Sequence, residues 1–149
     1  MRLRGAARVF TGLGQRIARG AALYNVREKI ASDIGNPLVF EGRKLVPGVT
    51  RTFHAGQPLY VFLQAYLHGA AAQRPLVAFV AFYRDGVKAL ETEPAGVADA
   101  WDLASRGVPV RFTVPLDSLE PGPYDCQITV LDPEGGRAAF WRAPIVIVR

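Results

Sequence analysis

Short apolar runs, separated by Gly, Pro and Asp, follow one another from Asn36 to the end of the sequence. Runs of this length between turn-forming residues are typical of β-strands, and their spacing predicts an all-β domain. Asp85 and Gly86 join two of the runs and predict a hairpin, because a type I′ turn needs positive φ at both central residues. About seven strands are expected, at residues 49–54, 59–67, 75–83, 87–93, 108–116, 119–132 and 137–148.

The segment LEPGPYDC, residues 119–126, predicts a particular architecture for this domain. In immunoglobulin-like β-sandwiches a Tyr stands two residues before the Cys position of a late strand, and its hydroxyl bonds back to the preceding corner. We therefore expect an immunoglobulin-like β-sandwich; the alternative is an ordinary turn with an exposed Tyr. The expected structural corner consists of Leu119, Pro121, Gly122, Tyr124 and Cys126.

Cys126 is the one cysteine of the chain, so no disulfide within the chain is possible and packing must hold the core together. A single Cys on an alternating strand is expected to be a small buried hydrophobic residue. The length of 149 residues suits one domain. We assign residues 49–149 to the sandwich, residues 21–48 to a connecting segment that begins as a short helix or is extended, and residues 1–20 to a flexible basic arm.

The formal net charge of +5 is concentrated in the first part of the chain. Residues 1–32 hold seven basic side chains and one acidic side chain, whereas residues 33–149 hold 11 basic and 12 acidic ones. The folded body is therefore close to neutral, and a nucleic-acid partner is not expected for it. Arg8 and Arg16 interrupt every apolar stretch that a signal peptide would need, so no signal peptide is recognisable. The alternative function is a binding module whose arm contacts anionic lipid or nucleic acid.

Catalytic and metal-binding constellations are not apparent. The histidines are His54 and His68, and no spacing places them beside each other or beside Cys126 as a local ligand pair. A nucleophilic Cys needs exposure and a positive environment, and the segment YDCQITV provides neither. We therefore expect a protein that is not an enzyme and that binds no cofactor and no metal ion.

The runs PLVAFVAFY and FWRAPIVIV place apolar side chains on both faces of their strands. A sheet face in contact with water normally carries polar residues, so both faces of this sheet are expected to be covered. Either residues 20–40 fold over the outer face, or the face docks another protein domain or another chain. The candidate interface residues are Val77, Phe79, Tyr83 and Phe140.

The chain resembles the C-terminal part of acidobacterial von Willebrand factor A-related proteins over about residues 21–149. The segments that carry the resemblance are NPLVFEGRKLVP, LYVFLQAY, and YDCQITVLD followed by FWRAP. In such proteins this region follows a von Willebrand factor A-type domain, and the proteins are usually exported. The chain has no D-x-S-x-S metal-adhesion motif, so the resemblance implies a tail domain without the A domain and without its ligand-binding site.

The expected function is that of a non-catalytic accessory or interaction domain in a bacterial envelope or secreted protein. The resemblance implies a location outside the cytoplasm and a protein partner, either an A-type domain or a second copy of the chain. Contact of the N-terminal arm with a membrane surface is the other possibility carried by the charge pattern.

Overall fold

A computed structural model of the protein describes residues 2–4, 22–29, 39–40, 43–47, 49–66, 75–97 and 107–149. Every regular element in these ranges is a β-strand, which confirms the expected all-β fold class. The strands are β1 (Arg2–Arg4), β2 (Ala22–Lys29), β3 (Val39–Phe40), β4 (Arg43–Pro47), β5 (Thr52–His54), β6 (Leu59–Tyr66), β7 (Val77–Arg84), β8 (Val87–Glu91), β9 (Ala95–Gly96), β10 (Gly107–Val114), β11 (Gly122–Asp132) and β12 (Arg137–Val148).

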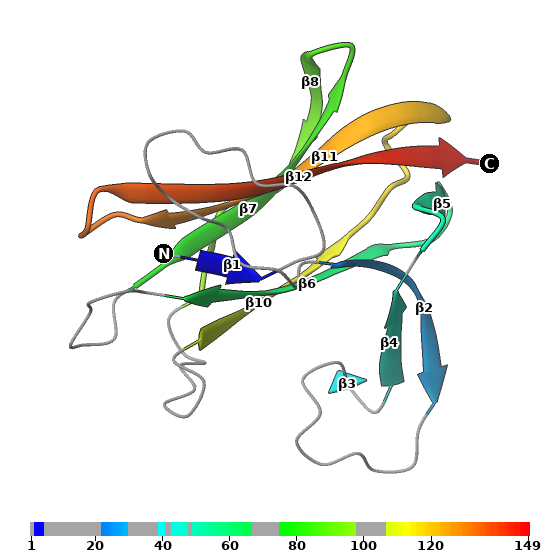
Figure 1. Ribbon diagram of the computed structural model, residues 1–149. Coiled ribbons are helices and arrows are strands. Elements are labelled where there is room, and N and C mark those ends of the chain that lie inside the picture. The colour runs from blue at the N-terminus through cyan, green and yellow to red at the C-terminus, as the bar shows by residue number, and fades with distance from the viewer. Residues whose placement is uncertain are drawn as a thin grey trace.

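The strands form two sheets that stack as a sandwich (Figure 1). Sheet A contains β1, β2, β3, β4, β6 and β10, and sheet B contains β5, β7, β8, β9, β11 and β12. The centre of sheet A is β6. One of its edges pairs with β10 along the whole strand, while its other edge is divided between β2, which pairs with residues 60–62, and β1, which pairs with residues 64–66.

Sheet B has the strand order β5-β12-β11-β7-β8, with β9 beside the first residues of β7. The neighbours are antiparallel except at one edge, where β5 runs parallel to the last residues of β12. Strand β8 follows β7 through the Asp85-Gly86 pair, whose φ angles of 51° and 78° are those a type I′ turn requires. The resulting hairpin projects beyond the body of the sandwich (Figure 1).

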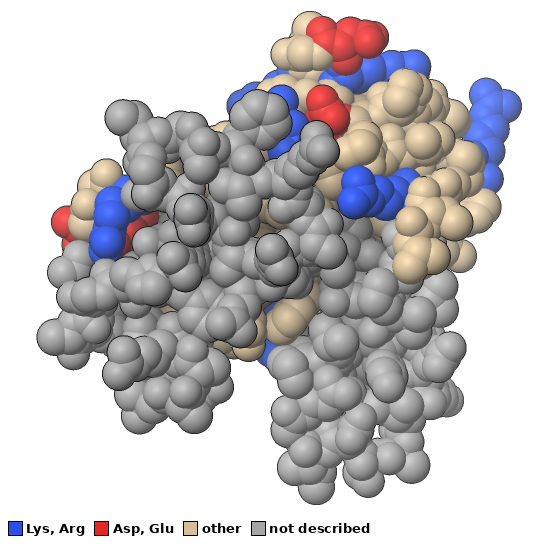
Figure 2. Space-filling model, in the orientation of Figure 1, with Lys and Arg blue, Asp and Glu red and all other residues tan. Residues whose placement is uncertain are grey.

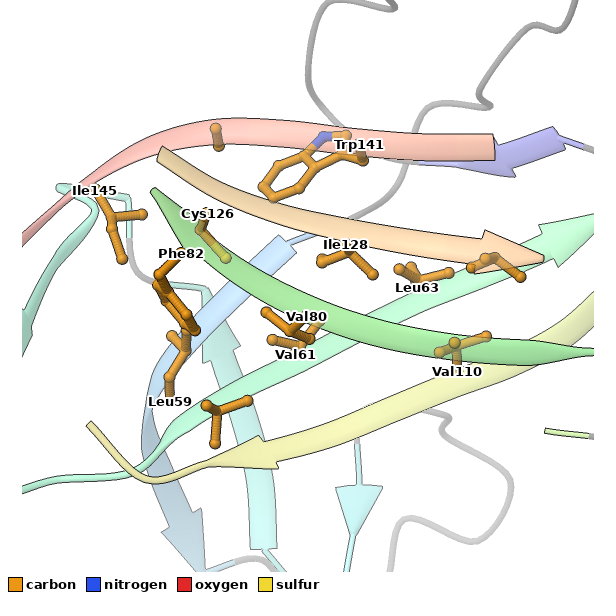
Figure 3. Close-up of a cluster of buried hydrophobic side chains, with 14 of the residues drawn as sticks. Leu59, Val61, Leu63, Val80, Phe82, Val110, Cys126, Ile128, Trp141 and Ile145 are labelled. Carbon is orange, nitrogen blue, oxygen red and sulfur yellow. The ribbon is translucent and has the colours of Figure 1, made fainter. Parts of the chain in front are cut away.

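The core lies between the two sheets and is built by strict alternation along the strands. In β6 the inward residues are at positions 59, 61, 63 and 65, and in β7 they are at 78, 80 and 82; all are at most 1% exposed. Figure 3 shows how the inward side chains of β7, β11 and β12 meet those of β6 and β10. The largest fully buried side chains include Phe53, Leu59, Phe82 and Ile128.

Each of the seven expected strands is present, with ends that differ by a few residues. For the connecting segment, which was expected to be helical or extended, the extended form is the one found, since Ala22–Lys29 is the strand β2. This segment contains Tyr24 and Val26, which favour strands, and it finds partners in both β6 and β4. The sandwich therefore includes strands from before residue 49. Within the expected arm, Arg2–Arg4 forms β1, and the rest of residues 1–20 lies outside the described residues.

Candidate functional site

The corner expected around Tyr124 is formed by residues of the loop between β10 and β11 and of the first part of β11. Leu119 and Tyr124 are buried, and the Tyr124 hydroxyl donates a hydrogen bond to the Glu120 carbonyl oxygen at 2.9 Å. Pro121 is exposed, and Gly122 has a φ of 145°, a conformation that side-chain-bearing residues rarely adopt. The arrangement closes the loop onto the core, which is a structural role.

Arg84 completes this corner from the far end of β7, 40 residues away in sequence from Tyr124. Its Nη1 donates to the Tyr124 hydroxyl at 3.4 Å and lies 3.5 Å from a Glu120 carboxylate oxygen. A Cβ on Gly122 would lie 2.8 Å from Arg84 Nη2, so the guanidinium occupies space that only glycine leaves open. No local sequence pattern indicates this contact, because it depends on β7 pairing with β11.

Cys126 is fully buried on β11, and burial raises the pKa of its thiol well above the ordinary range. The thiol is therefore neutral at physiological pH and unsuited to nucleophilic attack. His54 is exposed at the end of β5, where its Nδ1 lies 3.0 Å from the Arg149 carbonyl oxygen. His68 lies outside the described residues.

Three central strands of sheet B, together with β8, present the outward surface that contains the candidate interface residues. We call this surface the outer face of sheet B. Backbone register sorts its residues into rows that run across the strands. Across β7, β11 and β12 the rows are Val77–Leu131–Ala138, Phe79–Thr129–Phe140, Ala81–Gln127–Arg142 and Tyr83–Asp125–Pro144. Val77, Phe79, Tyr83 and Phe140 thus share one face, each of them half-buried.

The expectation that this face lacks polar residues is wrong, because β7 and β12 are not neighbours. Strand β11 lies between them, and its outward residues are Asp125, Gln127 and Thr129 along most of its length. Thr129 pairs with Phe79 on one side and with Phe140 on the other, and it is only 8% exposed. The aromatic side chains therefore flank a polar centre instead of forming one continuous apolar patch.

A network of contacts fixes the polar side chains of the outer face. Arg142 donates from Nε and Nη2 to Gln127 Oε1, at 3.1 and 2.8 Å. Gln127 Nε2 in turn lies 3.1 Å from the Thr129 hydroxyl. The Arg142 guanidinium also stands 5.0 Å from the centre of the Tyr83 ring, within range for a cation–π contact. The network orders these side chains before any partner arrives.

One of the two expected coverings of this face was the folding of residues 20–40 over it. The described part of these residues does not support that covering. Ala22–Lys29 and Val39–Phe40 are strands of sheet A, paired with β6 and β4, and so belong to the opposite layer of the sandwich. A docking partner for the outer face of sheet B remains a hypothesis.

Two further observations concern charge and metal-binding side chains. Among the described atoms that are visible in Figure 2, Lys and Arg side chains lie among Asp, Glu and uncharged residues. No three His, Cys, Asp or Glu side chains among the described residues lie close enough together to hold a metal ion. Within the same residues, no helix has the length and apolar character to cross a bilayer.

No protein-family model matches the chain, and no curated protein is similar to it in sequence.

Proposed function

We propose that the protein is a non-catalytic interaction domain that docks another protein on the outer face of sheet B. One observation carries this proposal. Two half-buried aromatic side chains, Phe79 and Phe140, lie on the same face as the ordered network around Arg142. Aromatic and Arg side chains are enriched at the energetic centres of protein interfaces. Side chains that are already ordered lose little conformational entropy on binding.

The architecture that we propose for the domain is immunoglobulin-like. The support is threefold: a Tyr hydroxyl bonded back to its corner, a sheet in the order β12-β11-β7-β8, and an early short strand, β5, that runs parallel to β12. The disulfide that bridges the sheets in antibody domains is absent, since Cys126 has no second cysteine to pair with. Packing of residues such as Phe82 and Ile128 replaces that bridge.

We further propose that the domain belongs to a von Willebrand factor A-related protein of a bacterial envelope or secretion route. The support for this is the resemblance of three segments, of which NPLVFEGRKLVP and LYVFLQAY lie in or before β6 and YDCQITVLD lies in β11. The partner would then be an A-type domain or a second copy of the chain.

The experiment measures binding of a separately expressed von Willebrand factor A-type domain by calorimetry, to the wild type and to Phe79→Lys and Phe140→Lys. Binding that both variants abolish supports the proposal, provided that their thermal unfolding matches that of Thr113→Lys, an exposed position on β10 in sheet A. Binding that neither variant changes places the docking surface elsewhere. Absence of binding to both an A-type domain and a second copy overturns the proposal.

A second candidate function rests on the seven basic side chains among residues 1–32. In this reading the arm contacts anionic lipid or nucleic acid. Binding to anionic vesicles, or to DNA, would then fall steeply with added salt and disappear when residues 1–20 are removed. Binding that survives this deletion excludes the arm as the contact.

A further inference from the structure

We propose that the outer face of sheet B binds the same face of a second copy of this chain, around a two-fold axis that runs along the strands between β7 and β11. This inference rests on the proposed function, since it names the partner of the same surface. A two-fold interface brings one patch onto itself, so the patch has to be complementary to its own rotated copy. The register of sheet B allows this condition to be tested row by row.

The strand order supplies the symmetry. Strands β8, β7, β11 and β12 lie side by side in this order. Rotation around an axis between the two middle strands exchanges β7 with β11 and β8 with β12, while every residue stays in its own row. Sheets that pack face to face in this aligned manner lie about 10 Å apart, close enough for side chains of both copies to meet.

The row that contains Glu91 and Arg142 is the one most complementary to its own rotated copy. Glu91 on β8 pairs with Ala81, which pairs with Gln127, which pairs with Arg142 on β12. The two charges therefore stand at opposite ends of one row, and the rotation brings Arg142 over the partner's Glu91, twice in each dimer. Both are exposed, and Glu91 is held by Lys88 at 3.1 Å just as Arg142 is held by Gln127.

The remaining rows add two favourable contacts. Tyr83 comes to lie over the partner's Asp125, where the phenol hydroxyl has a carboxylate to donate to. Val77 lies over the partner's Leu131, and Phe79 lies over the partner's Thr129. The same rotation places Ala81 over the partner's Gln127 and Pro144 over the partner's Lys88, so the favourable contacts are those of Arg142, Tyr83 and Val77.

An axis along β11 itself fails the same comparison. It would place Asp125 directly over the partner's Asp125 and Arg142 over the partner's Ala81. Like charges in contact are unfavourable, and the guanidinium would lose its carboxylate partner. The axis between β7 and β11 is therefore the arrangement that the charges favour.

The experiment reverses each charge in the full chain and measures association by sedimentation, over a concentration series that reaches about 1 mM. Arg142→Glu and Glu91→Arg alone should each weaken dimerisation by at least about tenfold, because each creates two contacts between like charges. Mixing the two variants should restore dimerisation, since the carboxylate introduced at position 142 of one chain then meets the guanidinium introduced at position 91 of the other. Arg149→Glu and Glu134→Arg, which change the charge equally at exposed positions away from the face, should associate as the wild type does.

Several outcomes overturn this inference: a wild type that stays monomeric over the whole series, a dimer that neither single variant weakens, or weakened variants that do not recover on mixing. Hydrogen exchange along β11 at low and high concentration gives an independent readout in the unchanged chain, and unchanged protection across the series also counts against the dimer. A monomeric chain that binds an A-type domain through Phe79 and Phe140 would reject the second copy and leave the proposed function standing.

Discussion

At the level of single residues, Tyr124 shows how one hydroxyl fixes the path of a loop. The hydroxyl donates to the Glu120 carbonyl and accepts from Arg84, so both of its hydrogen-bonding capacities are used in a nearly buried position. Gly122 makes room for the guanidinium that reaches it. The loop, the strand that follows it and the end of β7 are therefore held at one point.

Tyr124→Phe should lower the free energy of unfolding by about 1–2 kcal/mol, because the Glu120 carbonyl loses its partly buried hydrogen bond while the ring keeps its packing. Denaturant titration measures the change. Tyr83→Phe on the outer face is the matched control, since the ring remains available to Arg142, and it should stay within about 0.5 kcal/mol of the wild type. Equal effects of the two substitutions would remove the special role assigned to the corner.

Because of Cys126, the free energy of unfolding should fall as the pH rises into the alkaline range. Burial raises the pKa of its thiol, whereas in the unfolded chain the thiol ionises near its ordinary pKa of about 8.5. The unfolded state therefore gains stability as the pH rises beyond that value, and the folded state loses about 1.4 kcal/mol per pH unit relative to it. From pH 8 to 10 the free energy of unfolding of the wild type should therefore fall relative to that of Cys126→Ala. A difference that stays constant over this range would contradict the prediction.

At the level of elements, the β11–β12 hairpin is held by a charged pair at its tip. Asp132 is fully buried, accepts from Gly135 N at 2.8 Å, and receives Arg137 Nη2 at 2.7 Å. The carboxylate thus organises the turn PEGG and the first residue of β12 together. Since β11 and β12 supply much of the outer face of sheet B, this turn also sets their register.

Asp132→Ala should lower the free energy of unfolding by about 2–4 kcal/mol, because it removes the acceptor of the partly buried Gly135 amide and leaves Arg137 without this carboxylate. Denaturant titration again gives the value, and hydrogen exchange should show that protection falls first near Arg137. Glu134→Ala in the same turn is exposed and should be nearly neutral. A neutral Asp132→Ala would mean that the strands fix the hairpin without its turn.

Local patterns predicted most elements of this fold. Alternation and turn residues located β6, β7, β8 and β10, because each of these strands carries its own signal in adjacent residues. They did not decide between a helix and an extended segment for β2, because its extended form depends on pairing with β6 and β4, strands that follow it in the sequence. Propensity is a weak guide where distant partners decide the structure.

The candidate surface was predictable only in part, for the same reason. Val77 and Phe79 alternate with Ala78 and Val80, but both rows are apolar, so the sequence separates the two faces of this strand without deciding which one points outward. That Thr129 lies between Phe79 and Phe140 depends on strand order, which the apolar runs do not encode. The contact of Arg84 with Tyr124 is likewise a product of β7 pairing with β11.

At the level of the whole molecule, the N-terminal strand β1 adds only three residues to one edge of β6. Removal of residues 1–20 should therefore leave the sandwich folded, because the other edge of β6 remains fully paired with β10. Thermal unfolding of both chains should show midpoints that differ by no more than about 5 °C. A larger fall would show that the N-terminal residues are an integral part of sheet A.

The parallel pairing of β5 with β12 also governs when the protein can fold. His54 and Arg149, at the ends of these contacts, are 95 residues apart in sequence. A ribosome needs roughly 5–20 s to add that many residues, and during this time β5 has no partner in sheet B. Contacts between such distant residues also slow the search for the native state. During synthesis there is therefore an interval in which the early strands of the sandwich lack their partners and have to be kept from incorrect association.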